Sequence, residues 1–108
     1  MKVSVVVTIY NNESTILRVV NAIRKSSYQN IEIILVDDGS TDKSLKLITS
    51  TAKNQHVFRL TENRGRVYAR NYGFEKATGD IIVNVDSDVV IQKNTIQTVV
   101  TYLTEHSE

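Results

Sequence analysis

The sequence predicts an α/β fold in which a mostly parallel sheet lies between two layers of helices. Four short runs of apolar, largely β-branched residues alternate along the chain with four segments whose apolar residues recur at helical spacing. Such alternation builds a parallel sheet through right-handed crossovers, with helices on both of its faces. We therefore expect a single domain over residues 1–108, folded as a three-layer α/β/α sandwich.

The first half of the chain contains two strand–helix units. Residues 3–8 form a β-branched run that is typical of a strand buried on both faces. The helix that follows has an apolar face made of Ile16, Val19, Val20 and Ile23. Residues 31–36 predict the second strand. The second helix is expected to start at Ser40 or Thr41, which are both good N-caps, and to bury Leu45, Ile48 and Ala52.

The second half repeats this order. Residues 56–60 alternate in polarity, which favours a strand at the edge of the sheet. A helix is predicted over residues 67–77, with Val67, Asn71 and Phe74 on its inner side and Gly79 as a left-handed C-cap. Residues 81–85 predict the fourth strand. The last helix has an apolar face made of Ile96, Val99, Val100 and Leu103.

Composition excludes several classes of function. Thirteen Lys and Arg against twelve Asp and Glu leave a net charge of +1, so nucleic acid is not an expected partner. The absence of cysteine excludes disulfides and thiolate metal sites. No signal-peptide pattern and no apolar run of transmembrane length is present, so we expect a cytoplasmic protein, with the inner face of the membrane as the alternative location.

Polar clusters follow three of the four predicted strands, at residues 10–13, 37–42 and 86–88. Ligands of parallel α/β sheets bind outside the carboxyl ends of the strands. Any one cluster alone fits a solvated loop, but their convergence predicts a binding site at this edge of the sheet.

Asp86 and Asp88 are candidate metal ligands. On extended backbone, residues two apart project to the same side, and carboxylate oxygens suit Mg²⁺ or Mn²⁺. The alternative is that these acids only open the last helix and favour its dipole. A metal here would neutralise charge on a departing nucleoside diphosphate.

Asp37 and Asp38 end the second strand and are candidates for hydrogen bonds to a base or a ribose. Gly39 permits a tight turn or the close approach of a ligand. The alternative reading is a simple strand-to-helix turn with a capping serine.

Three arginines, Arg64, Arg66 and Arg70, surround the start of the third helix, where an anion is favoured. One or two of them would meet a diphosphate, whereas Arg64 also fits an ordinary solvated charge. Tyr10 is the tyrosine that is placed at a strand end, where it could stack on a base.

These motifs together resemble family 2 of the glycosyltransferases, which have the GT-A fold. The family pattern Val-Pro-x-Tyr-Asn stands here as Val7-Thr8-Ile9-Tyr10-Asn11, and Val-Asp-Asp-Gly-Ser-x-Asp stands as residues 36–42. The third pattern matches at Asn63, Gly65, Ala69, Arg70, Asn71, Gly73, Ala77, Gly79 and Asp80. The fourth is the Asp-x-Asp metal motif, Asp86-Ser87-Asp88.

The resemblance implies a nucleoside-diphosphate-sugar donor, most often a UDP-sugar, inversion at the anomeric carbon, and Mn²⁺ or Mg²⁺ as cofactor. It implies the strand order 3-2-1-4. The roles that it transfers place Thr8, Tyr10 and Glu13 at the base and ribose, with Asp38 on the base and Asp37 beside it. Arg66 or Arg70 would face the base or the diphosphate, Asp88 would bind the metal, and Asp86 the ribose or the metal.

Two departures from the family pattern matter. Thr8 replaces the usual proline, and the sequence ends soon after the metal motif, before the acceptor-binding part and the carboxylate that acts as general base. No catalytic residue is therefore assigned, and the acceptor-binding part is expected to be absent. The apolar strand 81–85 would then keep a free edge, so we expect a homodimer formed through this edge or through exchange of the C-terminal segment.

Other readings remain open at this point. A non-catalytic nucleotide-sugar-binding module, inactive alone, is the main alternative. A response-regulator receiver is disfavoured because its acidic pair should follow the first strand, whereas here the pair follows the second. A dinucleotide-binding domain is disfavoured because no Gly-x-Gly-x-x-Gly follows the first strand.

Overall fold

The computed structural model describes residues 1–50 and 55–106. Strands and helices alternate in this part of the chain as β1 (Val3–Ile9), α1 (Ile16–Arg24), β2 (Ile31–Asp37), α2 (Ser44–Thr49), β3 (Gln55–Arg59), α3 (Arg66–Lys76), β4 (Ile81–Asp86) and α4 (Thr95–Glu105). The strands form one sheet in the order β3-β2-β1-β4, and all three pairs are parallel. Both the predicted fold class and the predicted strand order are confirmed.

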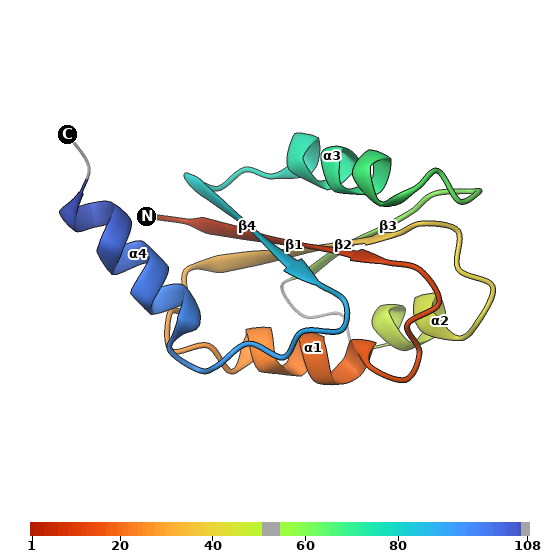
Figure 1. Cartoon of the computed structure of the whole chain (residues 1–108), viewed down its shortest axis with the longest axis horizontal. Helices are drawn as coiled ribbons and strands as arrows, with labels where there is room; N and C mark the ends of the chain where they lie inside the picture. The colour runs from red at the N-terminus through yellow and green to blue at the C-terminus, as the bar shows by residue number, and fades with distance from the viewer. Residues whose placement is uncertain (51–54, 107–108) are drawn as a thin grey trace.

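The sheet is the middle layer of the molecule (Figure 1). Helix α3 covers one of its faces, α1 and α2 cover the other, and α4 lies past the end at which β1 begins. Side chains of β1 alternate between two cores because successive residues of a strand point to opposite faces. Val3, Val5 and Val7 pack with α1, while Val6 packs with Ala69 of α3.

The predicted inner faces of the helices are confirmed for α1 and in part for α2 and α4. Ile16, Val19, Val20 and Ile23 are all buried. In α2, Ile48 is buried and Leu45 is half-buried, whereas Ala52 lies outside the described residues. In α4, Ile96 and Val100 are buried, but Leu103 is 38% exposed.

The predicted inner face of α3 is confirmed for Phe74, which is partly buried against the core around Val6 and Ala69, but it is wrong for Val67 and Asn71. Val67 is 67% exposed and Asn71 is exposed, and the helix instead buries Ala69 and Gly73 against the sheet. A Cβ atom on Gly73 would lie 2.5 Å from Val6 Cγ1, so the missing side chain is what lets the backbone of α3 approach β1 this closely.

Gly79 is not a left-handed C-cap, contrary to the prediction. Helix α3 ends at Lys76, its C-cap Ala77 is extended, and the glycines with positive φ in the described residues are Gly39 and Gly65. At Gly79 a Cβ would lie 2.7 Å from Ser4 Oγ and 2.8 Å from the carbonyl oxygen of Lys2. The glycine therefore serves close packing between the α3–β4 connection and the start of β1.

A buried carboxylate, Glu32, ties this connection to the sheet. It accepts hydrogen bonds from the Ser4 hydroxyl and from both the backbone N–H and the hydroxyl of Thr78, at 2.7 and 2.9 Å. Lys2 Nζ lies 3.6 Å from its second oxygen. Burial alone raises the pKa of Glu32, but the hydrogen bonds from Ser4 and Thr78 and the charge of Lys2 outweigh it and lower the pKa to about 2.

We expect Glu32→Gln to destabilise the protein by on the order of 2 kcal/mol at pH 7. Because the folded-state pKa of about 2 lies below the ordinary value of 4.5, the contribution is full above pH 4.5 and is lost as the pH falls from there towards 2. Urea unfolding of parent and variant should therefore give a stability difference that shrinks across this window. The exposed Glu75, changed to glutamine, is the control; a difference that does not depend on pH would contradict the assignment.

Strand β4 lies at one edge of the sheet and β3 at the other. Ile82 in β4 is 43% exposed. The homodimer through residues 81–85 or the C-terminal segment stays a prediction. No helix in residues 1–50 and 55–106 is long and apolar enough to cross a membrane.

Candidate nucleotide-binding site

The register of the sheet aligns the carboxyl ends of its strands. Thr8 of β1 lies between Val36 of β2 and Asp86 of β4, and Ile9 lies beside Asp37. The loops that leave these strands surround a cavity of about 430 Å³. Its wall consists of Thr8, Ile9, Tyr10, Asn12, Asp38, Asn63, Gly65, Arg66, Asp86, Ser87 and Asp88. The predicted convergence of the three polar clusters is confirmed.

The β1–α1 loop forms one side of the cavity and is shaped by its asparagines. Asn11 has a positive φ of 54°, which asparagine tolerates better than most residues. Its side-chain oxygen accepts hydrogen bonds from the backbone N–H groups of Thr41 and Asp42, at 2.8 and 3.2 Å. The loop is thereby joined to the β2–α2 loop. Tyr10 projects beside it and is 45% exposed.

Asp38 joins two walls of the cavity. The residue is 3% exposed, and its two carboxylate oxygens accept the backbone N–H groups of Arg64 and Gly65, at 2.7 and 3.0 Å. These are the residues just before α3, so the carboxylate fixes where α3 starts and where Arg66 lies. Asp38 lines the cavity and holds a neighbouring loop at the same time.

Asp37 and Gly39 shape the turn and do not line the cavity. Asp37 is fully buried, and its Oδ2 accepts the N–H of Ser40 at 3.0 Å, while its Oδ1 has no hydrogen-bond partner among the described residues. Gly39 has a φ of +73°, and a Cβ there would lie 2.7 Å from the backbone nitrogen of Asn63. Gly39 therefore permits the close approach of the backbone at Asn63, and not the close approach of a ligand.

The predicted N-caps of α2 are wrong. The N-cap position is occupied by Lys43, and neither Ser40 nor Thr41 caps the helix. The backbone N–H of Ser44 is instead bound by Asp42, at 2.8 Å, and Asp42 also accepts the N–H of Glu13 at 3.1 Å. Burial raises the pKa of Asp42, but the hydrogen bonds from Ser44 and Glu13 outweigh it, so the pKa lies below its usual value. Glu13 therefore contacts the β2–α2 loop rather than the cavity.

Asp86 and Asp88 both line the cavity, although not through an extended backbone. Asp86 is the last residue of β4, and residues 87 and 88 form a turn in which the N–H of Val89 donates to the carbonyl of Asp86 at 3.0 Å. Both acids are exposed, and neither carboxylate has a hydrogen bond or ion pair with any described residue. Helix α4 starts only at Thr95, so these acids do not open it.

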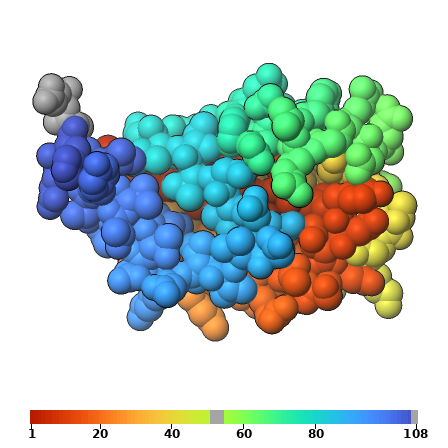
Figure 2. All heavy atoms as spheres, in the orientation of Figure 1, coloured from red at the N-terminus to blue at the C-terminus, as the bar shows by residue number. Residues whose placement is uncertain are grey.

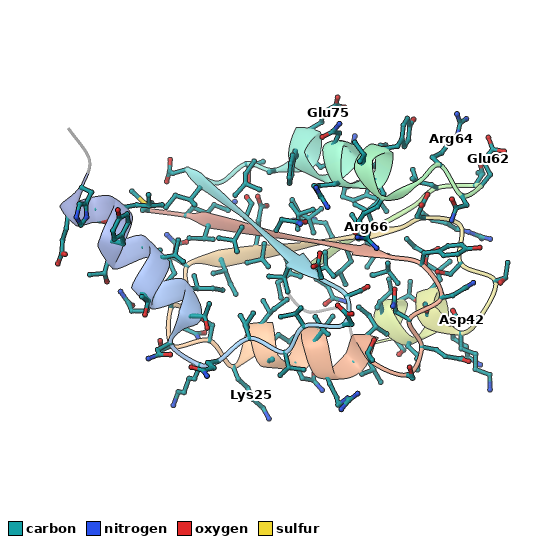
Figure 3. The ribbon with its side chains drawn as sticks, in the orientation of Figure 1. Lys25, Asp42, Glu62, Arg64, Arg66 and Glu75 are labelled. Atoms are coloured by element: carbon teal, nitrogen blue, oxygen red, sulfur yellow. The ribbon has the colours of Figure 1, made fainter. Side chains whose placement is uncertain are left out.

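The three arginines differ in placement. Arg66 lies at the first position of α3 and lines the cavity, and Figure 3 shows it directed towards the strand ends. Arg64 points outward, forms an ion pair with Glu62 at 3.0 Å, and is the solvated loop charge of the alternative reading. Arg70 lies one turn into α3, half-buried and outside the cavity wall.

The structure thus brings together six of the predicted residues, namely Thr8, Tyr10, Asp38, Arg66, Asp86 and Asp88. Four others are not part of the cavity wall, namely Glu13, Asp37, Gly39 and Arg70. Sequence reasoning missed Ile9, Asn12, Asn63, Gly65 and Ser87 as wall residues. The family motifs could have identified these five residues, because each stands inside or next to one of the four motifs.

Comparison with known proteins decides the family. The model of "Glycosyl transferase family 2" matches residues 4–108. The chain belongs to this family.

Curated relatives of this glycosyltransferase family 2 chain include glycosyltransferase GlyG of Streptococcus pneumoniae, which is 43% identical over 99 residues that cover 89% of this chain and 33% of GlyG. An uncharacterized glycosyltransferase of Haemophilus influenzae is 40% identical over 98 residues, which cover 88% of this chain and 39% of the relative. The chain therefore spans only about a third of the length of the curated relatives that it matches.

Solved structures of other glycosyltransferases share the fold. Staphylococcus aureus TarS 1-349 in complex with UDP-GlcNAc superposes with a TM-score of 0.91 at 33% identity, covering 98% of this chain and 32% of the TarS 1-349 chain. The mannosyltransferase PcManGT of Pyrobaculum calidifontis, in complex with GDP-Man and Mn²⁺, gives a TM-score of 0.90 at 27% identity, covering 98% of this chain and 33% of PcManGT.

Proposed function

We propose that this chain is the donor-binding part of an inverting glycosyltransferase and that its cavity binds a nucleoside-diphosphate-sugar, a UDP-sugar first of all, together with Mn²⁺ or Mg²⁺. The observation that carries the proposal is the composition of the cavity wall. A buried acid, a cationic arginine at a helix start and two unpartnered carboxylates meet in one cavity of about 430 Å³. The acid can accept a hydrogen bond from the base, the arginine can neutralise the diphosphate, and the two free carboxylates can bind the metal.

The base and ribose would lie between Tyr10, Thr8 and Asp38. Tyr10 offers an exposed ring for stacking, and Thr8 offers a hydroxyl. Each oxygen of Asp38 already accepts one backbone N–H, but a carboxylate has about four acceptor positions, so it can still accept a base N–H. Arg66 would face the diphosphate, where the start of α3 also favours an anion.

Asp86 and Asp88 fit a hard divalent cation. Both offer free carboxylate oxygens on the cavity wall. In the described ranges 1–50 and 55–106 no third His, Cys, Asp or Glu joins other such residues to form a group that could hold a metal, so these two acids would be the protein ligands. Two protein ligands are typical of Mg²⁺ or Mn²⁺ sites in which water and phosphate oxygens complete the coordination. A cation there would neutralise the negative charge of the leaving nucleoside diphosphate.

Binding assays test the proposal directly. Calorimetric titration with UDP, GDP and dTDP, each with and without Mn²⁺, should show that Mn²⁺ strengthens binding and that UDP binds most tightly. TarS is solved with UDP-GlcNAc and PcManGT with GDP-Man, so the base is a true variable within this fold. Absence of binding by all three nucleotides would overturn the proposal.

A binding module without catalysis is the second candidate. Among the described wall residues the carboxylates are Asp38, which holds a loop, and Asp86 and Asp88, which we place on the metal. This leaves no carboxylate of the wall to act as a base on an acceptor hydroxyl. Mn²⁺-dependent donor hydrolysis distinguishes the candidates, since a mere binding module would bind donor without hydrolysing it.

We expect Asp38→Asn to weaken UDP binding by about 1–3 kcal/mol, the usual cost of spoiling hydrogen bonds to a charged group. The amide nitrogen would also be a donor facing the N–H of Arg64 or Gly65, so the loop before α3 should loosen. Asp42→Asn is the matched control, because the same chemical change then falls outside the cavity wall. Calorimetry that shows equal losses in both variants would mean that these acids only shape their loops.

A further inference from the structure

The residue between the two proposed metal ligands is held on two sides by the β1–α1 loop. The hydroxyl of Ser87 donates to Asn12 Oδ1 at 2.8 Å, and the hydroxyl of Thr15 donates to the carbonyl oxygen of Ser87 at 2.9 Å. Figure 2 shows the two segments in contact on the visible face, with light-blue atoms of the β4 loop against orange-red atoms of the β1–α1 loop. The contact joins segments that lie more than 70 residues apart in sequence.

Asn12 is itself well fixed, so it can serve as an anchor. Its side-chain oxygen also accepts the backbone N–H of Tyr10 at 2.9 Å, and its own N–H donates to Ser44 Oγ at 2.8 Å. Its carbonyl accepts the N–H of Ile16 at 2.9 Å, at the first turn of α1. The anchor is therefore tied to the nucleotide side of the cavity, to α1 and to α2.

By contrast, the carboxylates of Asp86 and Asp88 have no partner in the described part of the chain, and both are exposed. The two acids lie two residues apart and carry like charges, which repel, and a turn without side-chain contacts would let them move apart. The hydrogen bonds at Ser87 are what restrain the turn between them. Holding ligands in place before the cation arrives reduces the ordering cost of binding.

We propose that Asn12, Thr15 and Ser87 form a latch that positions Asp86 and Asp88 for the divalent cation and couples the metal side of the cavity to its nucleotide side. The three are positioning residues, since they act through the two carboxylates. This inference rests on the proposed function, because it requires a metal at these carboxylates.

The test uses the metal-dependent part of UDP affinity, measured by calorimetry as the ratio of affinities with and without Mn²⁺. We expect Ser87→Ala and Thr15→Val each to lower this ratio by about three- to tenfold, as the loss of one hydrogen bond allows. Thr15→Ser keeps the hydroxyl and should restore the ratio. Ser14→Ala removes a serine hydroxyl, as Ser87→Ala does, but from an exposed position of the β1–α1 loop outside the latch, and it should leave the ratio unchanged.

The outcomes separate the latch from the proposed function. If Mn²⁺ has no effect on UDP binding by the parent, the assignment of the metal site is wrong and the proposed latch is refuted as well. If the parent responds to Mn²⁺ and both variants respond equally well, the latch alone is wrong. If Ser87→Ala lowers the affinity equally with and without metal, and lowers the unfolding temperature in parallel, Ser87 is only structural and the latch is also overturned. Loss confined to the metal-dependent ratio, with restoration by Thr15→Ser, supports it.

Discussion

Asp88→Ala is expected to remove most of the Mn²⁺-dependent part of UDP binding, a loss of at least about tenfold. Loss of one hydrogen bond that only positions the ligands is expected to cost about three- to tenfold, and removing one of the two protein ligands themselves should cost more. Asp88 is exposed on the cavity wall and has no other described partner, so its removal disturbs no packing and breaks no hydrogen bond of the fold. Metal-free UDP binding should therefore stay nearly unchanged.

Calorimetry with and without Mn²⁺ measures both parts in one protein. Glu75→Ala removes the same charge from an exposed position on α3, where Figure 3 shows the side chain directed away from the sheet, and is the matched control. An Asp88→Ala variant that binds UDP and Mn²⁺ as tightly as the parent would refute the metal assignment. Equal losses in Asp88→Ala and Glu75→Ala would show that only net charge matters.

Gly73→Val is expected to destabilise the fold by about 3 kcal/mol, the upper range for adding atoms to a packed core. The added Cβ would lie 2.5 Å from Val6 Cγ1 and 3.2 Å from Val36 Cγ2, and both valines are fully buried. Neither short, branched side chain can move aside, so α3 must shift away from the sheet. The gain in helix propensity from replacing glycine is below about 1 kcal/mol and cannot offset this.

Asn71→Val is the control for this variant, since it places valine on the exposed side of the same helix. Urea unfolding should show a clear fall in midpoint for Gly73→Val and little change for Asn71→Val. Because α3 begins with Arg66, a displaced helix should also weaken UDP binding. Equal stability of the two variants would mean that α3 does not rely on close contact with β1.

The regular parts of this fold could be predicted from sequence, and the contacts that depend on small or polar residues could not. Apolar, largely β-branched runs predicted β1, β2 and β4, and alternating polarity predicted β3. Apolar spacing predicted the inner face of α1, where Ile16 and Ile23 are buried. The same spacing failed in part for α3, because the residue closest to the sheet is Gly73, which has no side chain to contribute to an apolar pattern.

The candidate site shows the same division. Strand-end clusters predicted where the cavity lies, because the carboxyl ends of parallel strands meet at one edge. The family resemblance placed Asp38 at the ligand, but neither it nor the clusters predicted that Asp37 is buried in the turn, or that Glu13 accepts the backbone N–H of Lys43 instead of lining the cavity. Such choices are made between loops far apart in sequence, so a pattern read along the chain does not contain them.

The strand order has a consequence for the sequence of events in folding. On one side β1 pairs with β2, where Val3 meets Ile31, and on the other it pairs with β4, where Val3 meets Ile81. The second pairing closes a much longer loop and therefore has the larger entropic cost. The part of the cavity that we propose for the base comes from β1 and β2, early in the chain, whereas Asp86 and Asp88 follow in β4 and the turn after it. A ligand that contacts both parts of the cavity would therefore bind only after β4 has paired with β1. Once bound, it would stabilise β4, the strand that is farthest from β1 in sequence.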